Sequence, residues 1–161
     1  MGFEGSYLWR LRQKIGNELL LLPGADVLAF DDAERVLLMR RADTGRWSVP
    51  GGCAEPGSTF AQTAIRELEE ETGLRADPSG LEPFASLSDS TTTYPNGDKV
   101  QAFVMCFAVF RWTGALRPCD GEALELSFFA PQELPDDRNP YVDEALSLWN
   151  AYRKTGRFQA C

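Results

Sequence analysis

The chain has 161 residues, a length that suits one globular domain, and its hydrophobic share of 43% and charged share of 25% are ordinary for a soluble protein. Its net charge of −8 repels polyanions, which counts against stable nucleic-acid binding through phosphate contacts. It contains no histidine, so Ser-His-Asp and Cys-His catalytic groups and His-ligated zinc centres are excluded. Hydrolytic chemistry would have to come from carboxylates, lysine, tyrosine or a bound metal.

Neither a membrane span nor a secretory signal is visible in the sequence. No apolar run reaches the roughly 18 residues that a spanning helix needs, and the first residues lack the apolar core of a signal peptide. The cysteines are widely spaced, without a C-x-x-C pair, which is typical of reduced thiols: Cys53, Cys106, Cys119 and Cys161. We therefore expect one cytoplasmic domain over residues 1–161 with no membrane partner.

The first half of the chain contains three strand-like segments. Residues 24–30 and 36–39 are mostly apolar and flank an acidic turn, so we expect them to form a hairpin. Residues 47–49 should form a short third strand that ends at the Pro-Gly-Gly of residues 50–52.

A helix is predicted over residues 59–72. Thr59 and Gln62 have the spacing of a capping box, and Gly73 stands where a glycine commonly ends a helix. The helix therefore has both a start and a stop signal.

The second half returns to strands and closes with a helix. Residues 100–110 are rich in β-branched and aromatic side chains and follow an Asn-Gly pair at 96–97, a strong hairpin signal. Residues 124–129 form another expected strand, and the Asn-Pro pair at 139–140 is a good start for a C-terminal helix. Together these elements predict an α+β or α-β-α sandwich with a mixed β-sheet.

Acidic side chains gather on one arc of the predicted central helix. With Glu67 as the reference, Glu71 lies roughly 40° to one side and Glu70 roughly 60° to the other, whereas Glu69 points away and should be solvated. Carboxylates crowded in this way repel one another, and Mg²⁺ or Mn²⁺ would relieve the repulsion. A solvated acidic helix face is the alternative explanation of the run alone.

The surroundings favour a functional site. A Gly-Gly pair at 51–52 follows a strand and allows a ligand to approach the backbone closely. Arg66 precedes the first carboxylate and can hold it by a charge-assisted hydrogen bond.

This segment resembles the signature of the Nudix hydrolase family, G-x5-E-x7-R-E-U-x-E-E-x-G-U with U a bulky aliphatic residue. The match covers residues 52–74, and the VLLMRR strand and the W-x-V-P-G-G lead-in before it are also similar. The matching positions are Gly52, Arg66, Glu67, Leu68, Glu70, Glu71, Gly73 and Leu74. The resemblance implies an α/β/α sandwich and a pyrophosphohydrolase that acts on a nucleoside diphosphate linked to another moiety.

One position departs from the signature. Its first glutamate falls on Ser58, which suits the start of a helix. In the family this position commonly supports the metal cluster, so the number of bound metals is open here. Glu55, in the same loop, is a candidate to compensate.

The resemblance also implies a metal site and a mechanism. Glu67, Glu70 and Glu71 and the Gly52 carbonyl would hold one or more Mg²⁺, with Mn²⁺ as a substitute, and water would attack phosphorus in line. Arg66, Glu67, Glu70 and Glu71 are thus the expected catalytic residues. The general base is either Glu67 or a carboxylate late in the chain, in the loop 120–122 or at Glu125.

Substrate selection is expected from outside the signature. Tyr94 is a candidate to stack on a base, and Arg46 and Lys99 are candidates to bind phosphate. A small nucleotide is the expected partner: an ADP-ribose-like derivative first, a nucleoside triphosphate second. The alternative is a catalytically weak or silent Nudix-like domain that senses a nucleotide. Residues 7–15, with their bulky apolar side chains, are a candidate arm for a homodimer.

Overall fold

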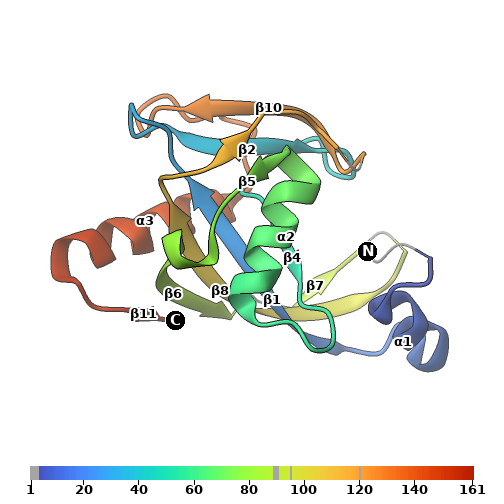
Figure 1. Cartoon of the computed structure of the whole chain (residues 1–161). Helices are drawn as coiled ribbons and strands as arrows, with labels where there is room; N and C mark the ends of the chain where they lie inside the picture. The colour runs from blue at the N-terminus through green and yellow to red at the C-terminus, as the bar shows by residue number, and fades with distance from the viewer. Residues whose placement is uncertain (1–3, 89–90, 95, 120) are drawn as a thin grey trace.

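The computed structural model describes residues 4–88, 91–94, 96–119 and 121–161 (Figure 1). Its helices are α1 (Tyr7–Ile15), α2 (Phe60–Thr72), the 3-10 helix η1 (Pro78–Gly80) and α3 (Pro140–Thr155). Its strands are β1 (Leu20–Ala29), β2 (Val36–Arg41), β3 (Trp47–Ser48), β4 (Gly51–Cys53), β5 (Leu74–Arg75), β6 (Glu82–Ser88), β7 (Thr92–Thr93), β8 (Lys99–Val109), β9 (Thr113–Gly114), β10 (Ala123–Phe129) and β11 (Gln159–Ala160).

The largest sheet is mixed, as the sequence predicts. Its order is β11-β6-β8-β1-β4, with β7 also paired to β8. The long β1–β8 pair is parallel, whereas β4 and β6 run antiparallel to their neighbours. A smaller sheet has the order β10-β2-β3, and β5 pairs with β9.

Helices α2 and α3 cover opposite faces of the large sheet (Figure 1). Successive side chains of a strand point to opposite faces, so Val27 of β1 packs with Leu68 of α2, whereas Leu28 packs in the cluster that contains Leu146 of α3. The expected α-β-α sandwich is therefore confirmed.

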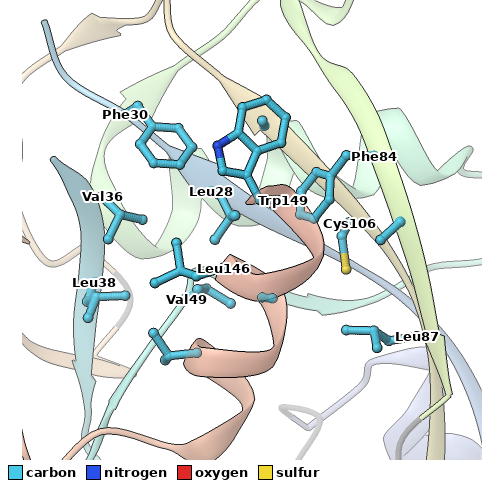
Figure 2. Packing of buried hydrophobic residues seen from close by; sticks show 14 of the residues in the cluster. Leu28, Phe30, Val36, Leu38, Val49, Phe84, Leu87, Cys106, Leu146 and Trp149 are labelled. Atoms are coloured by element: carbon cyan, nitrogen blue, oxygen red, sulfur yellow. The ribbon is translucent and has the colours of Figure 1, made fainter. Parts of the chain in front are cut away.

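Aromatic rings fix α3 against the sheet. The Trp149 ring stacks on Phe30 at a centroid distance of 5.7 Å and meets Phe84 edge-on at 5.3 Å, as Figure 2 shows. Asn139 caps the start of the helix by accepting a hydrogen bond from the Tyr141 N–H at 3.1 Å. The predicted start of the C-terminal helix is confirmed.

Both ends of α2 also follow the sequence signals. The Thr59 N–H donates to Gln62 Oε1 at 2.8 Å and the Gln62 N–H donates to Thr59 Oγ1 at 3.2 Å, which completes the capping box. Gly73 ends the helix with φ of 76°, a left-handed conformation that favours glycine.

The predicted hairpin of residues 24–30 and 36–39 is wrong. These strands, β1 and β2, share a single antiparallel bridge between Phe30 and Val36 and then enter different sheets. The turn itself is ordered by Asp31, whose Oδ1 accepts hydrogen bonds from the backbone of Ala33 and Arg35. Beyond the single bridge, β1 pairs along its whole length with β8, and β2 pairs with β10.

The short strand expected before residues 50–52 is β3, which ends at Ser48, but the glycines after it form a further strand that the sequence did not predict. Gly51–Cys53 forms β4, antiparallel to residues 24–26 of β1. The pairing depends on close approach, because a Cβ atom added to Gly24 would lie 2.8 Å from the Gly52 carbonyl oxygen. The glycines thus follow the end of β3 and also let two backbones approach closely.

Within the described residues, no helix is long and apolar enough to cross a membrane.

Candidate active site

Strand β4 and helix α2 meet at two glutamates. The Gly51 N–H donates to Glu71 Oε2 at 2.8 Å, which holds a carboxylate that is only 1% exposed. Gly52 lies against Glu67, since an added Cβ atom would fall 2.6 Å from Glu67 Oε1. Glycine at this position therefore leaves the space that the Glu67 carboxylate occupies.

Arg66 links the helix to β4. Its Nη2 donates to Glu67 Oε1 at 2.6 Å and to the Cys53 carbonyl at 2.9 Å, while its Nη1 donates to Glu70 Oε2 at 2.7 Å. One guanidinium thus fixes two carboxylates and a strand end. The supporting role that the sequence predicts for Arg66 has this geometric basis.

The three carboxylates of the acidic arc differ in burial. The Glu67 side chain is 13% exposed and the Glu70 side chain 52%, whereas Glu71 is enclosed. Glu69 points elsewhere and pairs with Arg75 at 2.7 Å, with a side chain 45% exposed.

Burial makes the Glu67 and Glu71 carboxyl groups harder to ionise than an ordinary glutamate. It raises the pKa of Glu67 to about 7, against the opposing effect of Arg66, and the charges of Glu70 and Glu122 raise it further. Burial likewise raises the pKa of Glu71 well above its ordinary value, although the hydrogen bond from Gly51 lowers it. A buried carboxylate is costly to ionise without a partner, and a bound cation would offset that cost. Such carboxylates are therefore candidates for a metal site.

The donor set fits Mg²⁺ as a two-carboxylate site. Among the described residues, no three His, Cys, Asp or Glu side chains gather closely enough to hold a metal. Mg²⁺ typically takes one or two carboxylates and completes its shell with substrate phosphate and water. Glu67 and Glu71 would supply these two carboxylates. Both are buried, and they lie close together, since the charge of Glu67 raises the pKa of Glu71. Glu70 would have to leave Arg66 to join them.

The other residues predicted from the sequence lie on several different elements. Glu125 is exposed on β10 opposite Arg40 of β2, and Arg46 is exposed in the loop before β3. Tyr94 is half-buried between β7 and β8, and Lys99 starts β8. Each assigned role stays a prediction.

Of the loop 120–122, Asp120 lies outside the described residues. Glu122 is exposed and close enough to Glu67 and Glu71 to raise the pKa of both. Ser58 and Glu55 line a groove of about 670 Å³ between α1, the start of β1 and the loop into α2.

The sequence interpretation missed Arg41, at the end of β2. Its Nε and Nη2 donate to the two oxygens of Asp43 at 2.9 and 2.8 Å. These hydrogen bonds raise the pKa of Arg41, and the charge of Glu71 raises it further, so its guanidinium lies near that carboxylate. The only signal was the pair of arginines that ends an otherwise apolar strand.

Asp26 was missed as well. It lies on β1, where it hydrogen-bonds to Tyr141 of α3, and the Tyr141 hydroxyl is 3.6 Å from Cys106 Sγ. Burial raises the pKa of Asp26 to about 6, while Tyr141 and the charge of Arg41 lower it. A carboxylate within the apolar run GADVLAF was the available signal.

Gly52→Ala is expected to lower the free energy of unfolding by about 1–3 kcal/mol, the usual cost of overpacking. The new Cβ atom would displace the Glu67 carboxylate that Arg66 holds. Urea unfolding measures the change. Gly80→Ala is the matched control, because a Cβ atom there meets nothing within 4 Å; an equal loss in both variants would contradict the packing described for Gly52.

Comparison with known proteins agrees with this geometry. The NUDIX domain model matches residues 20–149, which include the central strands of the two larger sheets, α2 and most of α3. The chain belongs to the Nudix family. A solved Nudix structure, the MutT NUDIX hydrolase from Burkholderia pseudomallei, superposes with a TM-score of 0.67 over 80% of this chain and 98% of that one. Its 22% identity supports the shared fold alone.

Curated Nudix-like relatives match parts of the chain. The MutT-like protein of Streptomyces ambofaciens is 30% identical over 112 residues, which cover 70% of this chain and 65% of that protein. The nucleoside triphosphatase NudI of an Enterobacter species is 34% identical over 74 residues, or 45% and 52% of the two chains. The chain thus spans less than two thirds of the length of each.

Proposed function

We propose that this Nudix protein is a Mg²⁺-dependent pyrophosphohydrolase of small nucleotides, with its active centre at Glu67, Glu70, Glu71 and Arg66. The observation that carries the proposal is the pair of buried carboxylates Glu67 and Glu71, set against the glycines of β4 and linked by Arg66 to Glu70. Relatives named as a nucleoside triphosphatase and an 8-oxo-dGTP diphosphatase support the reaction class.

In the proposed reaction, the oxygen of water bonds to one phosphorus while the bridging P–O bond breaks. The leaving phosphate departs with the electron pair of that bond. Glu67 Oε1 is held by Arg66, which leaves Oε2 to accept the water proton if Glu67 is the base, or to bind the metal if a later carboxylate is the base. Mg²⁺ or Mn²⁺, held by Glu67, Glu71 and the Gly52 carbonyl, would offset the charge that develops on phosphate.

Protein side chains would also orient the substrate. Arg41 lies near Glu71, which suits it to bind a phosphate, and Tyr94 is the candidate to stack on the base. Arg46 and Lys99 are further phosphate candidates. Glu122 and Glu125 are the alternatives to Glu67 as base, and the proximity of Glu122 to Glu67 favours it of the two.

An ADP-ribose-like derivative is the first choice of substrate and a nucleoside triphosphate the second. A panel of both classes, assayed with Mg²⁺, with Mn²⁺ and with EDTA, tests the proposal by chromatography of the products. Metal-dependent release of a nucleoside monophosphate is expected. No turnover of any substrate with either metal would contradict it.

A silent nucleotide-sensing domain is the second candidate, and Ser58 at the first glutamate of the signature favours it. Tight nucleotide binding by calorimetry without turnover would support this function over the first. The homodimer and the cytoplasmic location expected from the sequence stay predictions.

A further inference from the structure

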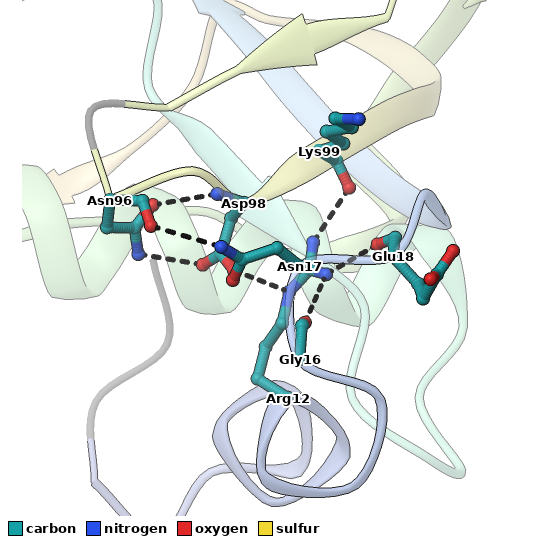
Figure 3. A network of polar contacts seen from close by, with 7 residues as sticks. All are labelled: Arg12, Gly16, Asn17, Glu18, Asn96, Asp98 and Lys99. Atoms are coloured by element: carbon teal, nitrogen blue, oxygen red, sulfur yellow. Dashed lines mark hydrogen bonds and ion pairs between the residues drawn. The ribbon is translucent and has the colours of Figure 1, made fainter.

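Arg12 of α1 contacts the turn between β7 and β8, as Figure 3 shows. Its Nε lies 3.3 Å from Asp98 Oδ1, and both side chains are only 9% exposed. Its Nη2 donates to the Lys99 carbonyl at 2.8 Å. A buried ion pair therefore links the N-terminal helix α1 to a turn that lies far along the chain.

The same guanidinium is fixed from its other side. Arg12 Nη1 donates to the carbonyls of Gly16 at 3.0 Å and Glu18 at 2.7 Å. Ion pairs buried in this way add little net stability compared with apolar contacts, but their hydrogen bonds are directional. Arg12 thus sets the position of the turn relative to α1 and the start of β1.

Asp98 determines the shape of the turn. Its Oδ2 accepts from Asn96 Nδ2 at 2.8 Å, and its backbone N–H donates to Asn96 Oδ1 at 3.2 Å. Its carbonyl accepts from the Tyr94 N–H at 2.9 Å, and the Tyr94 carbonyl accepts from the Gly97 N–H at 2.8 Å. The backbone of Tyr94 therefore depends on where Asp98 is held.

Tyr94, in this turn, belongs to an apolar cluster that borders the candidate active site at β4. Its side chain packs against Leu8 of α1, Leu22 and Val100. Cys53 of β4 packs against the same cluster, and its carbonyl accepts a hydrogen bond from Arg66 of the candidate site at 2.9 Å. The ring thus belongs to a cluster that connects α1 with β4, the strand that Arg66 binds. The Lys99 side chain, in contrast, points away from Arg12 (Figure 3).

We propose that Arg12 is a positioning residue, which acts through Asp98 to hold Tyr94 as an aromatic wall for the nucleobase of the substrate. The inference rests on the proposed function and extends it. It assigns a role in base binding to α1, outside the Nudix signature.

Arg12→Ala is expected to raise KM for a nucleotide substrate roughly five- to tenfold, part of the value of a base-stacking contact, while kcat stays within about twofold. The matched control is Arg10→Ala, an exposed arginine of the same helix that donates to the Gly5 carbonyl. Inhibition constants for the nucleoside monophosphate and for pyrophosphate distinguish a loss of base positioning from a general loss of active-site structure. The nucleoside monophosphate product should bind more weakly to Arg12→Ala by a similar factor, whereas inorganic pyrophosphate should bind as to wild type.

Amide hydrogen exchange tests the link without any turnover. The N–H groups of Tyr94 and Gly97 should exchange faster in Arg12→Ala than in Arg10→Ala. Asp98→Asn, which keeps the volume and removes the charge partner, should reproduce both effects and serves if Arg12→Ala does not fold. Equal exchange in the Arg12, Asp98 and Arg10 variants, or equal losses for monophosphate and pyrophosphate, would overturn the proposal. If no nucleotide is hydrolysed, the proposed function fails, and calorimetric binding of the monophosphate together with exchange decides the role of Arg12.

Discussion

Glu67→Gln is expected to lower kcat by about 10²–10⁴-fold, the usual contribution of a positioned general base. The Glu67 carboxylate lies against Gly52 and is held by Arg66 at 2.6 Å. Glutamine keeps its size and its contact with Arg66 but cannot accept a proton or offer a charge to a metal. The rate of nucleoside monophosphate release measures the effect, and thermal melting confirms that the variant is folded.

Glu69→Gln is the matched control on the same helix. Glu69 pairs with exposed Arg75 and faces away from the site, and exposed ion pairs contribute little. We expect kcat within about twofold of wild type, as for a surface substitution. A Glu67→Gln variant as active as Glu69→Gln would show that Glu67 has no part in the reaction.

The metal-free protein is expected to lose stability as pH rises from about 5 to 8. The folded pKa of Glu67, about 7, lies above its ordinary value of 4.5 because the carboxylate is buried. The protonated form is therefore favoured by folding, and this stability is present at low pH and lost as pH rises through 7. The shift corresponds to roughly 3 kcal/mol, and Glu71 acts in the same direction.

Urea unfolding in EDTA at pH 5 and pH 8 measures this loss. The other titrating groups contribute equally in Glu67→Gln. The free energy of unfolding of this variant should therefore decrease less between pH 5 and pH 8 than that of the wild type. At pH 8, Mg²⁺ should recover part of the lost stability in the wild type, since binding to the folded state stabilises it. An identical pH dependence in both proteins would contradict the pKa assigned to Glu67.

Local signals predicted the fold where they act on neighbouring residues. The capping box of Thr59 and Gln62, the Gly73 end of α2 and the start of α3 at Asn139 each depend on residues within one turn. Strand pairing was harder, because partners are chosen by the whole sheet. Thus β2 pairs with β10 and leaves β1, and β4 forms because Gly24 and Gly52 allow close approach.

The candidate site was also predictable only where it depends on neighbouring residues. Helical spacing placed Glu67, Glu70 and Glu71 on one arc, but it could not show that Glu71 is buried and Glu70 exposed. That difference arises from β4, whose Gly51 N–H binds Glu71. Arg41 was missed because its closeness to Glu71 depends on how the small sheet sits beside α2.

Hydrolysis in ¹⁸O-labelled water, with mass analysis of the products, tests the central claim most directly. With the best nucleotide of the panel and Mg²⁺, we expect one ¹⁸O atom on one of the two phosphate products, at a rate that falls to background in EDTA and in Glu67→Gln. A rate that is unchanged in EDTA, or no labelled product with either Mg²⁺ or Mn²⁺, would contradict metal-dependent cleavage at the acidic helix.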